Sequence, residues 1–216
     1  MHYIFCHGFG FSPRFFQRLV PYFAQERCSM VDLGYFGDAS IWPVLDDEPV
    51  VCIGHSLGFA KLCLSYGSIP QACGFIGLNG FVDFLGREAA LYRQRAAELA
   101  AMADQFSRAP ALVLRKFYRR CGAANFQDEV DLSALNYKAL TADFALLGHL
   151  RFIPPKRHCL LYSRDDLIVS DNLLHEQQKL GTNCLVVEGA HGHALGWVAC
   201  ETIYFKIKAF VDDICI

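Results

Sequence analysis

A serine stands between two glycines in the segment Gly54-His55-Ser56-Leu57-Gly58. The segment follows an apolar, strand-like run at 49–53 and precedes a stretch with helical character at 57–66. A serine on a sharp strand-to-helix turn projects its hydroxyl from the sheet edge, and only small residues fit two positions to either side of it. We therefore predict that Ser56 is a nucleophile. The alternative is an inert serine in a glycine-rich turn.

A second glycine-containing loop, His7-Gly8-Phe9-Gly10, comes directly after the first apolar run of the chain at 2–6. Acyl transfer needs N–H donors aimed at the negative charge that develops on the carbonyl oxygen. Glycine lets the backbone approach a substrate closely because it has no Cβ atom. We predict that the N–H groups of Phe9 and Leu57 form this oxyanion hole. An ordinary turn at a strand end is the alternative reading of the loop.

Two adjacent carboxylates, Asp165 and Asp166, follow the apolar run at 158–162. A carboxylate at the end of a parallel strand faces the same sheet edge as Ser56. We favour Asp166 as the acid that orients a catalytic histidine, because the apolar residues 167–169 would pack down and fix its loop. Asp165 is the alternative.

Two histidines, His191 and His193, follow the last strand-like run of the chain. A histidine must accept the serine proton and later give it to the leaving group. We favour His193 as this base, because it precedes a small residue and a helical stretch, and His191 is the alternative. His7 and His55 are interpreted as structural residues that hold turns.

Short β-rich runs alternate with helical stretches along the chain, which predicts a parallel sheet with right-handed crossovers. We predict strands at 2–6, 28–32, 49–53, 74–78, 158–162 and 183–187. We predict helices near 13–26, 57–66, 87–105, 108–121, 134–149, 171–180 and 197–213.

The interval between the fourth and fifth predicted strands is too long for one crossover helix. We therefore predict an all-helical lid insertion at 81–150, with 1–80 and 151–216 forming the core. Basic side chains outnumber acidic ones within 87–120, and such a face attracts an acidic partner. A solvated helix face would have the same composition. The residues interpreted as a carrier-protein docking face are Arg108, Arg115, Lys116, Arg119 and Arg120.

The chain has 216 residues, of which 53% are hydrophobic, and a net charge of −2. This length is typical of one domain with a substantial apolar core. No apolar run approaches the roughly 18 residues of a membrane span, and no secretory signal is evident. We expect a cytoplasmic protein without a metal, a cofactor or a nucleic-acid partner. None of the ten cysteines forms a CxxC pair, so we expect free thiols.

Five short motifs together resemble the α/β-hydrolase superfamily, in the same order along the chain. They are HGFG, DLGYFG at 32–37, GHSLG, SRDDLIVS and GHAL. The order Ser56, Asp166, His193 is also the one that this fold uses. The resemblance implies about six mainly parallel strands with flanking helices and a helical lid. Gly34-Tyr35 departs from the usual Pro-Gly of the second motif, and the usual leading hairpin is missing.

A narrower resemblance links the chain to the small esterases of biotin synthesis, which cleave the methyl ester of pimeloyl-acyl carrier protein. It rests on the shared motif layout and on the lid-like segment FSRAPALVLRKFYRRCG. This resemblance implies a serine carboxylesterase that acts on an acyl ester presented by acyl carrier protein. The alternatives are a thioesterase or a menaquinone-pathway lyase on the same fold, and a non-catalytic binding protein that keeps the fold.

Overall fold

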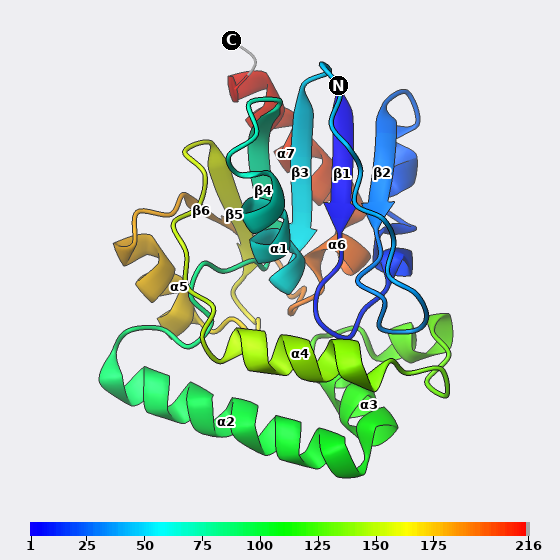
Figure 1. Ribbon diagram of the computed structural model, residues 1–216. Helices are drawn as coiled ribbons and strands as arrows, with labels where there is room; N and C mark the ends of the chain where they lie inside the picture. The colour runs from blue at the N-terminus through cyan, green and yellow to red at the C-terminus, as the bar shows by residue number, and fades with distance from the viewer. Residues whose placement is uncertain (215–216) are drawn as a thin grey trace.

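The structure is a computed structural model that describes residues 1–214. Its centre is one sheet of six parallel strands in the order β2-β1-β3-β4-β5-β6 (Figure 1). The strands are β1 (His2–Cys6), β2 (Arg27–Val31), β3 (Val50–His55), β4 (Ala72–Leu78), β5 (His158–Ser163) and β6 (Cys184–Val187). The predicted fold class, six parallel strands with flanking helices, is confirmed.

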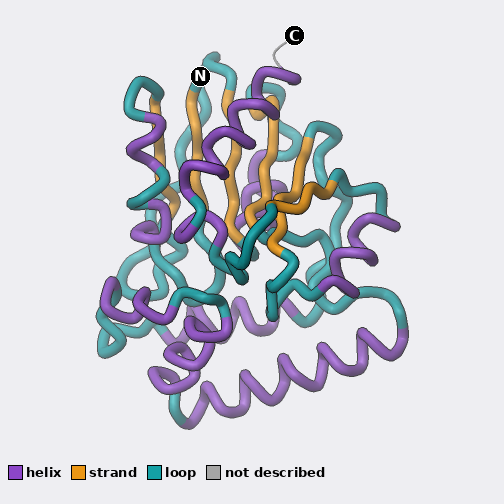
Figure 2. Tube along the Cα trace, turned by 180° about the vertical axis from the view of Figure 1, so that it is seen from behind, coloured by secondary structure: helices purple, strands orange, loops and turns teal. Residues whose placement is uncertain are grey.

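Helices cover both faces of the sheet, which is why its central strands are apolar along their whole length. Every residue of β1 and β3 is buried. The helix α1 (Leu57–Tyr66) lies on one face and α7 (Cys200–Ile214) on the other, as the two opposite views show (Figures 1 and 2). Two further helices, α5 (Asp171–Lys179) and the short α6 (Leu195–Val198), complete these layers.

The segment between β4 and β5 is helical and lies below the carboxyl ends of the strands in Figure 1. It contains α2 (Ala89–Arg108), α3 (Pro110–Arg120), the 3₁₀ helix η3 (Ala124–Glu129) and α4 (Tyr137–Leu147). An antiparallel bridge joins Asp83 to Arg151 where the segment leaves and rejoins the sheet, with the Arg151 Nε atom 2.7 Å from Asp83 Oδ2. The division into a core and a lid domain stays a prediction.

The helix expected near 13–26 is wrong as a single element. The structure has two short 3₁₀ helices there, η1 (Pro13–Phe16) and η2 (Val20–Phe23), each with a proline in its first turn. Pro21 has no N–H group for an α-helical hydrogen bond and its ring excludes the preceding turn, so one continuous α-helix cannot form.

Three findings concern residues 1–214 as a whole. No helix in this part of the chain is long and apolar enough to cross a membrane. Its nine cysteines are free thiols, and Cys215 lies outside the described residues. No group of three or more His, Cys, Asp and Glu side chains within 1–214 could hold a metal ion.

Candidate active site

Three side chains from different parts of the chain meet at the carboxyl edge of the sheet. Ser56 follows β3, Asp166 follows β5 and His193 follows β6. The Ser56 Oγ atom lies 2.8 Å from His193 Nε2, and His193 Nδ1 lies 2.8 Å from Asp166 Oδ2. The exposed fractions of these residues are 5% for Ser56, 3% for Asp166 and 0% for His193. A hydroxyl, an imidazole and a carboxylate thus form one buried hydrogen-bonded chain.

The backbone at Ser56 has a φ of 52° and a ψ of −122°, which an L-residue rarely adopts. The flanking glycines explain why the turn can be so tight. A Cβ atom on Gly58 would lie 2.2 Å from the carbonyl oxygen of Cys6, and one on Gly54 would lie 2.2 Å from the backbone of Phe59. The strand, turn and helix therefore approach more closely than side chains at these positions permit.

The loop of residues 7–10 lies directly against the serine. A Cβ atom on Gly8 would come within 2.8 Å of the Ser56 Cβ atom. Leu57 is the first residue of α1, so its N–H group has no acceptor within the helix. The N–H group of Phe9 donates to no other group among residues 1–214. The positive end of the α1 dipole adds to the attraction for an anion at this point.

Contacts from two other segments hold this loop in place. The His7 ring is 3.0 Å from the carbonyl of Gly8 and accepts a hydrogen bond from the Leu33 N–H group at 3.0 Å. On the opposite side, the Tyr118 hydroxyl of α3 donates to the carbonyl of Gly10. His7 therefore has the turn-holding position expected for it.

The two candidate acids have different surroundings. Asp166 Oδ1 accepts hydrogen bonds from the N–H groups of Ile168 at 2.7 Å and Val169 at 2.8 Å, while its other oxygen faces His193. Asp165 is exposed, and its Oδ1 atom accepts hydrogen bonds from the N–H groups of residues 191 and 192 at 3.0 and 2.9 Å. The structure therefore brings Asp166 into the hydrogen-bonded chain, and Asp165 holds the loop that carries the histidines.

The two candidate bases, His191 and His193, also have different surroundings. The His191 ring donates from Nε2 to the carbonyl of Glu188 at 2.9 Å, away from the serine. His193 is also held through its backbone: its N–H group donates to the carbonyl of Cys121 at 3.0 Å, and its own carbonyl accepts from His55 Nε2 at 2.8 Å.

His55 is a neutral structural residue. Its ring is fully buried and stacks on Phe15 with ring centroids 4.0 Å apart. Burial, with a smaller contribution from the nearby His193, holds the pKa of His55 well below its usual value. A neutral ring can donate one hydrogen bond, and here it supports the backbone of the neighbouring histidine.

Asn79 is a site residue that the sequence did not reveal. It follows β4, is fully buried and has a φ of 52°. Its Nδ2 atom donates to Asp166 Oδ2 at 2.8 Å and to the carbonyl of Gly192 at 3.3 Å, and its Oδ1 atom accepts from the Leu195 N–H group at 3.3 Å. The available signal was its place directly after a strand at the edge where the other residues meet.

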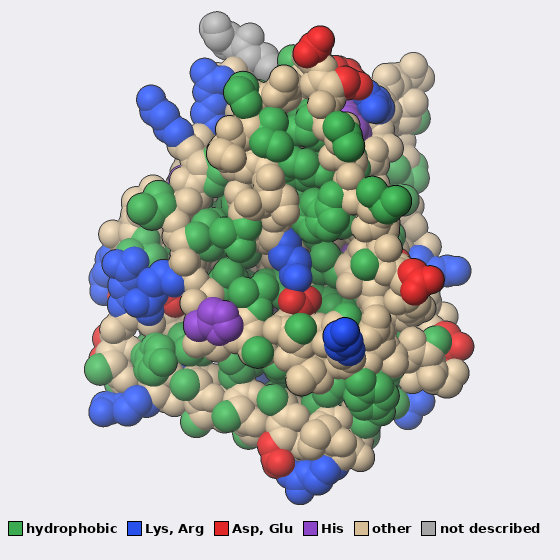
Figure 3. Space-filling model, viewed as in Figure 1, with side chains coloured by type: hydrophobic (Ala, Val, Ile, Leu, Met, Phe, Trp, Pro, Cys, Tyr) green, Lys and Arg blue, Asp and Glu red, His purple; other side chains and the backbone are tan. Residues whose placement is uncertain are grey.

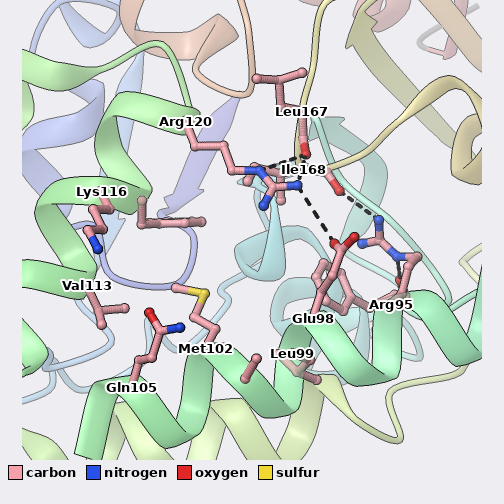
Figure 4. Close-up of a pocket in the computed structure, with 13 residues that line it drawn as sticks. Arg95, Glu98, Leu99, Met102, Gln105, Val113, Lys116, Arg120, Leu167 and Ile168 are labelled. Atoms are coloured by element: carbon pink, nitrogen blue, oxygen red, sulfur yellow. Dashed lines mark hydrogen bonds and ion pairs between the residues drawn. The ribbon is translucent and has the colours of Figure 1, made fainter. Parts of the chain in front are cut away.

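A cavity of about 340 Å³ lies between α2, α3 and the loop after β5, and none of Ser56, Asp166 and His193 lines it (Figure 4). Its wall is mostly apolar, with several charged heads at the rim. It is lined by Phe84, Arg95, Glu98, Leu99, Ala101, Met102, Gln105, Val113, Lys116, Phe117, Arg120, Leu167 and Ile168. Phe117 connects the cavity to the loop of residues 7–10, because its ring centroid lies 6.0 Å from that of Phe9. Leu167 and Ile168 connect it to the acid that precedes them.

The five basic residues interpreted as a docking face differ in their contacts. Arg108 forms an ion pair with Asp104 on its own helix. Arg120 donates two hydrogen bonds to the carbonyl of Leu167. The other three, Arg115, Lys116 and Arg119, are exposed and form no ion pair with any residue in 1–214. On the face drawn in Figure 3, basic side chains lie mainly along the margins, with apolar side chains between them.

Comparison with known proteins identifies the fold. No protein-family model matches the chain, and no curated protein matches it in sequence. Among solved structures, an esterase from Exiguobacterium antarcticum superposes with a TM-score of 0.76 at 13% identity, covering 98% of this chain and 92% of the esterase. MenH from S. aureus gives a TM-score of 0.69 at 15% identity, covering 100% of this chain and 95% of MenH.

A thioesterase domain from the curacin biosynthetic pathway gives a TM-score of 0.64 at 14% identity, covering 96% of this chain and 90% of that domain. At these identities the similarity shows the fold alone. The chain therefore has the α/β-hydrolase fold, as its motifs indicated.

Proposed function

We propose that this protein is a serine carboxylesterase, with Ser56 as nucleophile, His193 as general base and acid, and Asp166 as the residue that orients the imidazole. The observation that supports the proposal most strongly is the hydrogen-bonded chain between these three side chains, with both links at 2.8 Å. The two N–H groups of Phe9 and Leu57 beside the serine complete the requirements of acyl transfer.

The mechanism follows from these positions. Ser56 Oγ attacks the ester carbonyl while His193 Nε2 takes the hydroxyl proton, and the negative charge on the carbonyl oxygen meets the N–H groups of Phe9 and Leu57. The C–O bond to the alcohol then breaks, and His193 returns its proton to the departing alkoxide. Water repeats the sequence on the acyl-serine ester and releases the carboxylic acid. Asp166 stabilises the imidazolium that forms in each half-reaction.

The substrate that we propose is the methyl ester of pimeloyl-acyl carrier protein, in biotin synthesis. The resemblance of the motifs supports this assignment. The apolar cavity of about 340 Å³ between α2 and α3 offers space for an acyl chain. The exposed basic residues Arg115, Lys116 and Arg119 offer a cationic face for an acidic carrier. Arg108 and Arg120 contribute charge to the same face, although each already has a bonding partner.

Two matched pairs of variants test the catalytic assignment. Ser56→Ala, His193→Gln and Asp166→Asn should each lower the hydrolysis of a p-nitrophenyl acyl ester strongly, whereas His191→Gln and Asp165→Asn should retain most activity. Labelling by a fluorophosphonate probe should be lost in Ser56→Ala. A parent protein that the probe does not label would support a non-catalytic binding protein, and full activity in Ser56→Ala would refute the assignment.

Growth of a biotin auxotroph that lacks its own pimeloyl-ester esterase tests the substrate. The parent gene should restore growth without biotin and the Ser56→Ala gene should not. Failure to restore growth despite soluble expression would leave a generic esterase. Faster hydrolysis of an acyl-CoA than of the matched methyl ester would favour a thioesterase.

A further inference from the structure

The loop after β5, residues 164–169, has to hold the carboxylate of Asp166 in one position, although it contains no regular secondary structure. Two of its own N–H groups, those of Ile168 and Val169, converge on Asp166 Oδ1 at 2.7 and 2.8 Å. Its tip is open to solvent, because Leu167 is an exposed apolar residue. Val169 is buried in the core, whereas the exposed part of the loop depends on contacts from outside it to keep the Ile168 donor aimed at the carboxylate.

Each of the two donors belongs to a peptide group whose carbonyl is bound by an arginine of the helical segment. The peptide that joins residues 167 and 168 carries the Leu167 carbonyl, which accepts from Arg120 Nε at 3.2 Å and Nη2 at 3.0 Å. The next peptide carries the Ile168 carbonyl, which accepts from Arg95 Nη1 at 3.0 Å. Figure 4 shows both arginines reaching the loop from separate helices.

A peptide group is planar, with its C=O and N–H bonds on opposite sides. An arginine that fixes the oxygen therefore also fixes the direction of the N–H group. The charges also favour this arrangement. A guanidinium cation at the carbonyl oxygen polarises the peptide group, which strengthens the hydrogen bond from the peptide N–H group to the carboxylate anion. The same arrangement occurs twice in succession, and both N–H groups end on the same carboxylate oxygen.

Both arginines have further contacts, and Arg95 is the more firmly held of the two. Arg95 of α2 is only 7% exposed, donates from Nε to the carbonyl of Phe84 at 2.6 Å and lies over the Phe84 ring. Burial lowers the pKa of Arg95 to about 10, opposed by the attraction of Glu98 and Asp166, so the guanidinium is still charged at neutral pH. Arg120 of α3 is half-exposed, and its Nη2 atom lies 3.7 Å from Glu98 Oε2.

We propose that Arg95 and Arg120 are positioning residues that fix Asp166 through the two peptide groups following it. This inference rests on the proposed serine hydrolase mechanism and extends it, because it makes the helical segment part of the catalytic support. It also gives Arg120 a role other than carrier docking.

Substitution of Arg120 tests the proposal, because this side chain is 52% exposed and its loss should leave the fold intact. With p-nitrophenyl acetate, whose acyl group is too short to use the cavity, Arg120→Gln should lower kcat about tenfold while KM stays within about twofold. Arg120→Lys, which retains one cationic donor, should recover part of this loss. Arg93→Gln, at an exposed position on α2, is the matched control and should behave like the parent.

A spectroscopic measurement gives a second readout without substrate. The downfield proton resonance of the His193 Nδ1–H group, identified by its loss in Asp166→Asn, should broaden or shift in Arg120→Gln and stay unchanged in Arg93→Gln. The proposal is overturned if Arg120→Gln matches Arg93→Gln in kcat and in this resonance while Ser56→Ala is inactive. An active Ser56→Ala protein would instead overturn the proposed function, and this inference with it.

Discussion

Replacing Asn79 with glycine should lower both stability and turnover, because this buried amide contacts both Asp166 and the loop that carries His193. Its Nδ2 atom donates to Asp166 Oδ2 at 2.8 Å, and its Oδ1 atom accepts from the Leu195 N–H group at 3.3 Å. Glycine is the appropriate replacement because the backbone φ of 52° suits a residue without a Cβ atom. The variant therefore removes the side-chain contacts without adding backbone strain.

The expected loss of unfolding free energy can be estimated from the hydrogen bonds that the substitution removes. A hydrogen bond to an ionised carboxylate contributes roughly 1.5–3 kcal/mol, and a buried group left without its partner costs roughly 1–3 kcal/mol. Water entering the space left by the amide would restore part of this, so we expect Asn79→Gly to lose about 3 kcal/mol of unfolding free energy. If half of that support acts on the imidazolium-forming step, kcat falls about tenfold. Asn79→Ala should lose about 1 kcal/mol more, because alanine is strained at this φ.

Urea unfolding and p-nitrophenyl acetate kinetics measure the two quantities on the same samples. The comparison of Asn79→Gly with Asn79→Ala separates the lost contacts from the backbone strain. An Asn79→Gly protein with the unfolding free energy of the parent and kcat within twofold of it would refute the reasoning. That result would mean that the Asn79 amide contributes to neither stability nor turnover. The N–H groups of Ile168 and Val169 would then be sufficient to hold Asp166.

Three further predictions concern different features of the site. Ser56→Gly should abolish activity. Its unfolding free energy should exceed that of Ser56→Ala by about 1–2 kcal/mol, because glycine relieves the strained φ of 52°. Equal stability of the two variants in urea would contradict this. Burial holds the pKa of His55 well below its usual value, so below about pH 6.5 the unfolded chain takes up a proton that the folded protein does not. The unfolding free energy should therefore fall as the pH drops from 6.5, less steeply in His55→Gln; parallel curves would argue against it. Met102→Trp should fill part of the cavity and raise KM for long-chain p-nitrophenyl esters but not for the acetate; equal changes for both would place the acyl chain elsewhere.

The sheet could be predicted because its strands carry a local signal. β1 and β3 are buried throughout, so each appears in the sequence as an apolar run that ends in a glycine turn. The single helix predicted near 13–26 is wrong. The aromatic and aliphatic residues of this segment have helical spacing, but Pro21 divides it into two short 3₁₀ helices. Sequence pattern therefore located the elements but missed the backbone constraint within one of them.

The site residues differ in how far their signal in the sequence is local. Some belong to a contiguous motif, and others are defined by contacts with distant parts of the chain. Ser56 and its glycines form one contiguous motif, so the turn was recognisable. Asp165 and Asp166 occupy the same strand end, and their contacts with distant residues decide which of them faces His193. The partner of Asp166, Asn79, is 87 positions away in the sequence, and no spacing rule connects the two. Arg120 has the spacing of a solvated face, yet it bonds to a carbonyl 47 positions away.

The helix α3 and the residue that follows it contact three of the loops near Ser56. The Tyr118 hydroxyl binds the carbonyl of Gly10, Arg120 binds the loop of the acid, and the carbonyl of Cys121 at the end of the helix accepts the N–H group of His193. An outward movement of α3 would break all three of these contacts at once. We therefore predict that a substrate reaches Ser56 past other segments while α3 stays in place.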